Sequence, residues 1–481
     1  MFKKSFPFSL YLFSILWCSI ATASQELPDI GTVGSSALTI DKEKEYGWAF
    51  RMMANQALPI IHDPVLNKYI DDLGDNLVAH ADSVKLPFHF FLIQDKEINA
   101  AAFLGGNVKI HTGLFLYAKN ESELASVLAH EIAHITQRHL ARMLEQQSIN
   151  SPTTLAALAG SVLLTLVNPA AGIAALSTSM AVSMQSQINY TRQNEYEADR
   201  IGIQTLANAG YDPYGMANFF SKLAEKYKYA TMPPQMLLTH PIPETRLAES
   251  RLRASQFPVK KVKNNLAYQL SKARIIVRYN DAPAQTSINF YQNQLKNKSY
   301  QLEEAAEYGL TLAYLQNKDY EKAHEMTLAL LKNNPSNLFF IDLLADTAIS
   351  VKKPEEAIKV LQAYYKQSPE NPVYTLNLVN ILQMTKQYQE AEEKLALFIR
   401  THPNNILAHQ LAIDLYRQMK KPAKEHASKA QYLALLGQFR EASQEMGSAL
   451  IYADNKLDQA RYAAQIENYK KDDLKLRSLQ K

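Results

Sequence analysis

The chain has only one cysteine among its 481 residues, Cys18. It lies in a segment typical of a secretory signal peptide, in which Lys3 and Lys4 precede an apolar run over residues 6–20 and the small residues Ala21-Thr22-Ala23 follow. Cleavage after Ala23 would leave no cysteine, which excludes a disulfide framework. A secreted chain of this length without disulfides must be stabilised by its hydrophobic cores. We therefore expect a protein of the periplasm of a Gram-negative bacterium.

A surplus of charge of one sign is also missing. The sequence has 51 Lys and Arg against 47 Asp and Glu, a formal net charge of +4. Loss of Lys3 and Lys4 with the signal segment would reduce it by two, to +2. This balance gives no indication of nucleic-acid binding.

Downstream of the signal segment, the chain has no long apolar run. Residues 155–167 and 170–184 are nearly free of charge, but Asn168-Pro169 separates them and each is shorter than the roughly 20 residues that cross a bilayer. We interpret 155–184 as an apolar helical hairpin. It could cover the active site, make peripheral contact with a membrane surface, or form a re-entrant segment.

The most informative motif is His130-Glu131-Ile132-Ala133-His134. Two histidines four residues apart lie on one face of a helix, so both imidazoles can reach the same metal ion. Asn120 and Glu123 form a helix-capping pattern before the motif. Glu131 would stand beside the metal, where a carboxylate can take a proton from the attacking water. The pattern indicates a zinc-dependent peptidase.

A second motif offers a third metal ligand. Glu195 and Asp199 lie four apart in a helical stretch that closes near Gly210, so they share a face. One carboxylate can bind the metal while the other hydrogen-bonds a ligating imidazole. Two helices that present His, His and Glu leave the fourth zinc position open.

The residues together resemble the gluzincin metallopeptidases that include the HtpX-like, CAAX-prenyl-protease-like and β-barrel assembly-enhancing proteases. The resemblance covers residues 95–250 and is closest to the last group. It rests on the two motifs above, on Asn99–Phe103 followed by Gly105-Gly106, and on Thr239-His240-Pro241 with Arg246 beyond.

This resemblance implies a zincin-type α+β domain with one zinc ion per chain. It implies that His130, His134 and Glu195 bind the zinc, that Glu131 is the general base and that Asp199 supports the ligands. It also implies unfolded or misassembled outer-membrane proteins as clients, and the β-barrel assembly machinery as a partner.

The segment before the first motif predicts a small sheet, with β-prone runs at 88–93, 99–103 and 108–111. A substrate peptide could add to the exposed edge of this sheet at Asn99, Ala100, Ala101 and Ala102. The alternative is that these strands only cover the active-site helix.

Two histidines and one arginine have more than one possible interpretation. His240, between a Pro-containing loop and Pro241, could be a transition-state donor, a fourth zinc ligand that gates the enzyme, or an ordinary loop residue. Arg246 could hold a substrate carbonyl or carboxylate, or join two helices. His139 has no partner at ligand spacing, and we interpret it as a core or surface residue.

The second half of the chain is periodic. Three series of residues repeat at intervals of 34 positions. They are the alanines Ala323, Ala357 and Ala391, the prolines Pro335, Pro369 and Pro403, and the leucines Leu310, Leu344 and Leu378. This is the spacing of tetratricopeptide repeats. The register is expected to lapse after Pro403 and to recover near Gly437. Such solenoids bind proteins on a concave face.

We therefore predict a mainly α chain with four parts: a signal peptide at 1–23, a zinc metallopeptidase domain at 24–257, a linker at 258–265 and a repeat solenoid at 266–481. Two functions follow. The chain is a periplasmic zinc endopeptidase that degrades misassembled clients, or it is a non-proteolytic assembly factor with a largely latent zinc site.

Overall fold

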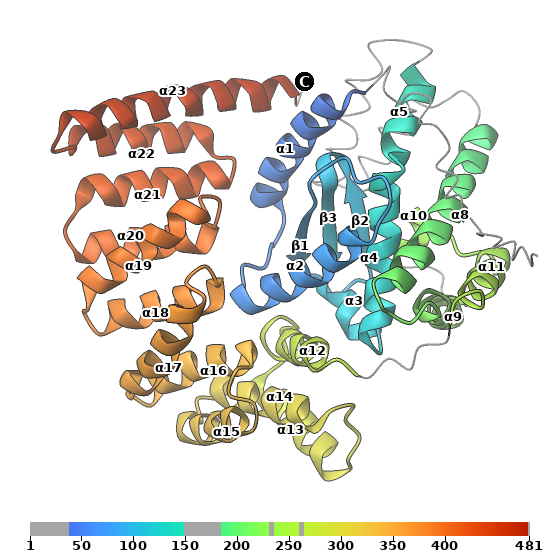
Figure 1. Cartoon of the computed structure of the whole chain (residues 1–481), viewed down its shortest axis with the longest axis horizontal. Helices are drawn as coiled ribbons and strands as arrows, with labels where there is room; N and C mark the ends of the chain where they lie inside the picture. The colour runs from blue at the N-terminus through green and yellow to red at the C-terminus, as the bar shows by residue number, and fades with distance from the viewer. Residues whose placement is uncertain (1–37, 149–183, 230–234, 259–263, 480–481) are drawn as a thin grey trace, which may run out of the picture.

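The structure, a computed structural model, describes residues 38–148, 184–229, 235–258 and 264–479 (Figure 1). The predicted signal peptide and nearly all of the predicted apolar hairpin at 155–184 lie outside these ranges. The elements of the first half are α1 (Ile40–Ala57), α2 (Pro64–Ala79), β1 (His89–Ile93), β2 (Ala100–Phe103), η1 (Leu104–Gly106), β3 (Asn107–His111), α3 (Thr112–Tyr117), α4 (Glu121–Thr136), α5 (His139–Ser148), α8 (Met184–Asn208), α9 (Gly215–Tyr227), α10 (Gln235–Thr239) and α11 (Glu244–Ala254).

The predicted small sheet is present, with the strand order β1-β3-β2. β1 runs parallel to β3, and β2 runs antiparallel to it with Ala101 opposite Lys109. β2 is therefore an edge strand. The tight turn into β3 uses Gly105 and Gly106, whose φ angles of 73° and 80° favour glycine.

The sheet and α4 form one hydrophobic core. Ala100, Val108 and Ile110 are fully buried and belong to the same cluster as Leu124 and Leu128 of α4. α8 lies along α4 on the side away from the sheet (Figure 1). Gly202 allows this close approach, because a Cβ there would lie 3.1 Å from the backbone nitrogen of His130. The packing thus brings the Glu195 segment of α8 beside the histidines of α4.

The second half consists of antiparallel helices, as the 34-residue period predicts. They are α12 (Leu266–Arg278), α13 (Ala284–Lys296), α14 (Glu303–Gln316), α15 (Tyr320–Asn333), α16 (Leu338–Ser350), α17 (Pro354–Gln367), α18 (Pro372–Met384), α19 (Tyr388–Thr401), α20 (Ile406–Gln418), α21 (Pro422–Leu435), α22 (Phe439–Ile451) and α23 (Lys456–Leu479). Ala323, Ala357 and Ala391 are fully buried where neighbouring helices meet. The predicted fold class, a small-sheet α+β domain followed by an α-solenoid, is confirmed.

The repeat register does not lapse after Pro403, contrary to the expectation from the alanine and proline positions. Lys318, Lys352, Lys386 and Lys420 are 34 apart and all have positive φ, between 55° and 68°, in the turn between paired helices. Pro422 likewise begins α21 34 residues after Tyr388 begins α19. In this part of the chain the 34-residue period is visible in the turn geometry, whereas the position 34 residues after Ala391 is occupied by Glu425 instead of alanine.

Both ends of the helical array contact the first half of the chain. Near its start, Arg274 of α12 binds Asp63, the N-cap of α2, with an Nε–Oδ2 distance of 2.6 Å. At its end α23 returns to α1, where Lys475 pairs with Glu45 at 3.4 Å. The ring of Phe439, the first residue of α22, stacks on Trp48 of α1. The array therefore curves back onto the N-terminal helix (Figure 1).

None of the helices in the described ranges combines the length and the apolar character that a membrane crossing requires.

Candidate metal centre

The active-site helix begins where its sequence predicts. The Asn120 side chain accepts a hydrogen bond from the backbone nitrogen of Glu123 at 3.0 Å, and the Glu123 carboxylate accepts one from the backbone of Lys119 at 2.6 Å. These contacts satisfy orphan N–H groups at the helix N-terminus and set its first turn. From this start, the helical periodicity of α4 places His130 and His134 on the face that meets α8, where both contact Glu195.

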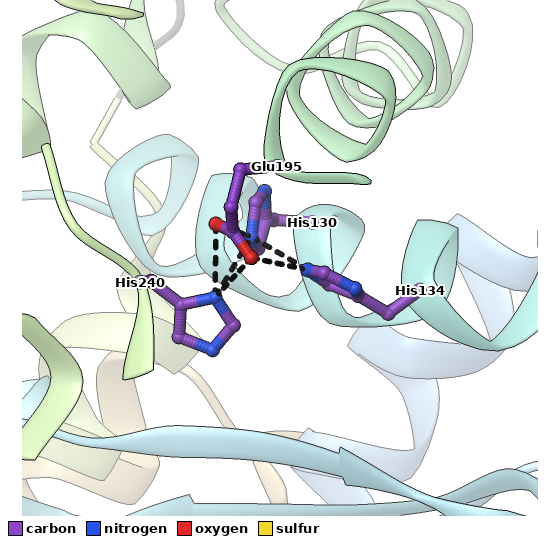
Figure 2. A group of neighbouring side chains, drawn as sticks. All are labelled: His130, His134, Glu195 and His240. Atoms are coloured by element: carbon purple, nitrogen blue, oxygen red, sulfur yellow. Dashed lines mark hydrogen bonds and ion pairs between the residues drawn. The ribbon is translucent and has the colours of Figure 1, made fainter. Parts of the chain in front are cut away.

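Four potential ligand atoms converge at this point, and all lie within 4.8 Å of one another (Figure 2). They come from His130 and His134 of α4, Glu195 of α8 and His240 directly after α10. The two histidine Nε2 atoms are 3.0 Å apart, and each lies 3.3 Å from an oxygen of Glu195. The cluster therefore joins three segments that are far apart in the sequence.

A second set of contacts orients the first histidine. Asp199 Oδ1 lies 2.9 Å from His130 Nδ1. Arg246 of α11 binds both Asp199 oxygens, at 2.7 and 2.8 Å, and also reaches Glu195 at 2.9 Å. Because Arg246 is only 2% exposed, its guanidinium is engaged by protein carboxylates inside the core. Of its two proposed roles, the geometry favours that of a link between α8 and α11.

The donor set fits a bound cation. Burial by itself lowers the pKa of His130, but its hydrogen bonds to the Asp199 and Glu195 carboxylates outweigh burial and raise that pKa to about 10. Burial lowers the pKa of His134 to about 3, which keeps its imidazole neutral. The Glu195 and Asp199 carboxylates thus favour positive charge at the buried spot where two imidazoles and a carboxylate converge. Histidine nitrogens and carboxylate oxygens are common ligands of zinc in proteins.

Glu131 lies beside this cluster and is only 1% exposed. Its Oε2 accepts a hydrogen bond from the backbone nitrogen of Ala102 in β2 at 2.8 Å. Its Oε1 accepts no hydrogen bond from the described residues, and it lies 3.6 Å from His240 Nε2. Burial raises the pKa of the Glu131 carboxyl above its usual range. One oxygen is therefore fixed in place while the other can accept a proton.

His240 stands directly against the other three residues. Its Nδ1 lies 3.0 Å from both oxygens of Glu195 and 3.4 Å from His130 Nε2 (Figure 2). The backbone nitrogen of His240 donates to Met236 at 2.8 Å, so the short helix α10 holds it in this position. The geometry places His240 within ligand distance of the site.

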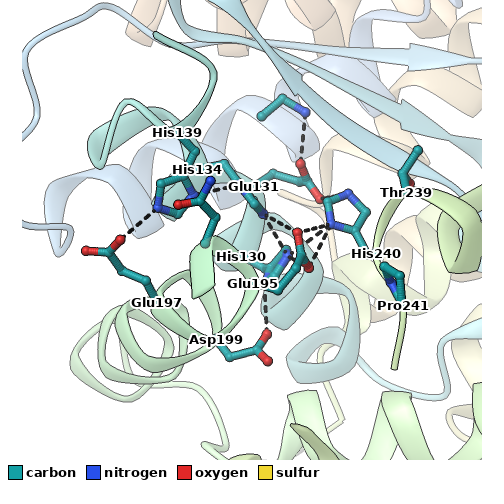
Figure 3. Close-up of polar contacts among 12 residues, drawn as sticks. His130, Glu131, His134, His139, Glu195, Glu197, Asp199, Thr239, His240 and Pro241 are labelled. Atoms are coloured by element: carbon teal, nitrogen blue, oxygen red, sulfur yellow. Dashed lines mark hydrogen bonds and ion pairs between the residues drawn. The ribbon is translucent and has the colours of Figure 1, made fainter. Parts of the chain in front are cut away.

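His139 is a site residue that the sequence interpretation missed. It is buried, but its ring contacts both His134 and Glu197 (Figure 3). The spacing of five residues from His134 matches no ligand pattern, and Glu197 is 58 residues further along the chain. The only signal in the sequence was a third acidic residue, Glu197, between Glu195 and Asp199.

A cleft of about 320 Å³ opens in front of the cluster. Glu131, His134 and His240 line it, together with Asn99, Ala101 and Ala102 of the predicted substrate strand. Ala100, the remaining member of that strand prediction, has its side chain buried in the core. The rest of the lining is mainly apolar, with Leu86, Phe103, Leu104, Ile135, Leu140 and Met143.

Comparison with known proteins agrees with this arrangement. Residues 64–254 match Peptidase family M48, and residues 348–415 match the tetratricopeptide repeat. The chain is 46% identical to a putative beta-barrel assembly-enhancing protease of Vibrio cholerae over 443 residues, which cover 92% of each protein. It is 39% identical to a beta-barrel assembly-enhancing protease of Yersinia pestis over 460 residues, 95% of this chain and 94% of that protein.

Among solved structures, yeast Tom70 is 12% identical and aligns with a TM-score of 0.29 over 73% of this chain and 88% of its own. The sequence relatives span nearly the whole chain, and the motif-bearing region matches a peptidase family. The chain therefore belongs to the beta-barrel assembly-enhancing proteases of peptidase family M48, and it is a metallopeptidase that carries tetratricopeptide repeats.

Proposed function

We propose that the chain is a zinc-dependent endopeptidase of the Gram-negative periplasm that degrades misassembled outer-membrane proteins. His130, His134 and Glu195 would hold one zinc ion. The observation that carries this proposal is the convergence of their ligand atoms next to Glu131, whose Oε1 accepts no hydrogen bond from the described residues. The client class is supported by the names of the relatives, which describe beta-barrel assembly.

The proposal divides the chain as its sequence suggests. A signal peptide at 1–23 would be cleaved, the peptidase domain would span 24–257, and the repeats would span 266–481 after a linker at 258–265. The helix boundaries support this division, since α11 ends at Ala254 and α12 begins at Leu266.

Bound zinc would supply Lewis-acid polarisation of the scissile carbonyl. Glu131 acts as the general base: its Oε1 takes a proton from the attacking water and later passes it to the leaving amine. The hydrogen bond from Ala102 to Oε2 keeps this carboxylate in one orientation. Asp199 holds the His130 ring, and Arg246 in turn holds Asp199.

The substrate would bind as an extended strand along β2. β2 is an edge strand, and Asn99, Ala101 and Ala102 line the cleft. In the antiparallel pairing Ala102 directs its N–H away from β3 and toward Glu131. A peptide added at this edge would therefore pass directly in front of the general base.

His240 would act as a gate in this scheme. With its imidazole beside the other ligands it would fill the fourth zinc position, and a site with four protein ligands is closed. We interpret the present arrangement as the latent form, which opens when α10 and the residue after it move. Replacement of His240 by alanine is expected to raise cleavage of an unfolded protein substrate several-fold. Unchanged activity would rule out both the gate and the donor role, and reduced activity would favour the donor role.

A second function is favoured by the same position of His240. If the closed form dominates, the repeat array could assist assembly of clients, and contact the β-barrel assembly machinery, without proteolysis. Glu131→Gln separates the two functions. An assembly defect in cells that carry this variant would favour proteolysis as the main role, whereas normal assembly would favour the non-proteolytic role.

The direct test is to measure zinc content and cleavage of an unfolded protein by the mature chain, with and without a chelator. The proposal predicts one zinc per chain and activity that the chelator abolishes and zinc restores. Absence of zinc, or activity that resists the chelator, would overturn it.

A further inference from the structure

A chain of hydrogen bonds extends outward from His134 through a second histidine. His139, the first residue of α5, places its Nδ1 2.8 Å from His134 Nδ1. Its Nε2 lies 3.1 Å from Glu197 Oε2 of α8, and Arg142 donates to the same oxygen at 2.6 Å. His139 is 4% exposed, so bulk water does not replace these contacts (Figure 3).

The positions of the nitrogens determine where the protons lie. His134 Nε2 faces His130 Nε2 and Glu195, so this nitrogen is the one that ligates and must carry a lone pair. A neutral imidazole has a single N–H, which for His134 is then at Nδ1. The contact between the two Nδ1 atoms needs one donor and one acceptor, and His134 supplies the donor.

The same reasoning assigns His139. Its Nδ1 must accept, so its own N–H is at Nε2, where it donates to the Glu197 carboxylate. The opposite tautomer of His139 would place two N–H groups against each other and leave Glu197 without this donor. The Arg142 guanidinium holds Glu197 from the other side.

We propose that His139 is a positioning residue that, through Glu197 and Arg142, fixes the tautomer and ring orientation of the metal-directed His134. The inference rests on the proposed function, which assigns His134 to the metal. It deepens that function by giving the second histidine a support equivalent to the one that Asp199 and Arg246 provide for the first.

The backbone explains how a residue only five positions away can turn back onto His134. Between α4 and α5, Arg138 adopts a left-handed conformation with φ 53°. This conformation is unfavourable for a side chain of this kind, so it needs anchoring. Arg138 is buried and its Nε donates to Glu43 of α1 at 2.8 Å. The buried pair thus holds the reversal that brings His139 against His134.

The test measures zinc affinity of the full mature chain by competition with a chelator. His139→Phe fills the same space without an acceptor, and is expected to bind zinc about 10–100-fold more weakly, the usual effect of losing a partner behind a ligand. His139→Asn keeps an oxygen near the position of Nδ1 and should restore affinity close to that of the wild type. His80→Phe, at an exposed histidine directly after α2, is the matched control and should leave the zinc affinity unchanged.

Nitrogen-15 NMR of the histidines in the zinc-loaded wild type gives an independent readout. It should show His139 with its proton on Nε2, and this result decides the proposal even where His139→Phe fails to fold. A proton on Nδ1 of His139, or wild-type zinc affinity in a folded His139→Phe, would overturn the positioning role of His139 alone. Absence of zinc from the wild-type protein would overturn the proposed function and this positioning role together.

Discussion

The peptidase half and the repeat half of this chain use their interiors differently. The first buries charge: Glu131, Glu195, Asp199 and Arg246 are all at most 3% exposed. In the central repeats, the positions that recur in the interior are small and apolar, such as Ala323, Ala357 and Ala391. A buried charge costs free energy unless it is paired, whereas a buried methyl group contributes favourably. The peptidase half therefore depends on ion pairs such as Arg246–Asp199 to hold its buried charges, while the repeats gain stability from the packing of apolar side chains.

The junction between the halves resembles the peptidase half in this respect. Arg274 is buried and binds Asp63 of α2 at 2.6 Å and Asp342 of α16 at 2.7 Å. Tyr279 also donates to Asp63 at 2.8 Å. Asp63 gains Arg274 and Tyr279 as partners only when both halves are folded and docked, so these contacts make the docking specific.

The largest expected effect is on chemistry alone. Glu131→Gln should lower kcat/KM for an unfolded protein by about 10²–10⁴-fold, because it removes the general base. The amide oxygen can still accept the hydrogen bond from Ala102, so the thermal midpoint and zinc content should stay at wild-type values.

The matched control for this variant is Glu225→Gln, an exposed glutamate on α9. It should leave kcat/KM unchanged. Retention of full activity by Glu131→Gln would contradict the assignment of the base.

The next effect is on stability at the junction. Arg274→Met should cost about 3–5 kcal/mol in the free energy of unfolding, because it leaves the Asp63 and Asp342 carboxylates buried without their cation. Urea denaturation measures this change. Arg400→Met, at an exposed arginine on α19, should change the same quantity by less than about 0.5 kcal/mol. A similar small loss in Arg274→Met would mean that the two halves do not depend on this ion cluster.

Within the repeats, an oversized side chain should affect stability without affecting chemistry. Ala357→Leu should cost about 1–3 kcal/mol, since its site on α17 is fully buried and already packed. Ala363→Leu places the same side chain on the exposed face of the same helix and should be nearly neutral. Cleavage rates below the unfolding transition should be the same for both variants, and a loss of activity specific to Ala357→Leu would show that the halves are more tightly coupled than this comparison states.

The smallest expected effect is a gain. Lys352 has φ 60° in the turn before α17, so Lys352→Gly removes a strained conformation and should stabilise the chain by about 0.5–1 kcal/mol. Lys359→Gly, at an exposed position inside α17, should have the opposite sign and cost about 1 kcal/mol. Equal losses in both variants would mean that the left-handed turn is not strained.

The two halves also differ in how far they could be predicted. The 34-residue period predicted the helical array because each repeat contacts its neighbours, so the same local pattern recurs. The predicted loss of register after Pro403 was wrong. The prediction followed only the recurring alanines and prolines, whereas after Pro403 the period appears in the turn residue Lys420 and in Pro422 at the start of α21. In the peptidase half, helical spacing predicted which residues share a face, as for His130 and His134, but not what that face meets.

The sequence by itself determined the metal-binding helix motif, the acidic pair on a second helix, the small sheet and the repeats, because all of these depend on spacing within one element. Only the tertiary structure decided the rest. His139 reaches His134 through a reversal at Arg138, Arg246 turns inward to Asp199, and α23 closes back onto α1. These contacts join residues by packing between elements, and no local period records the direction from which a distant side chain arrives.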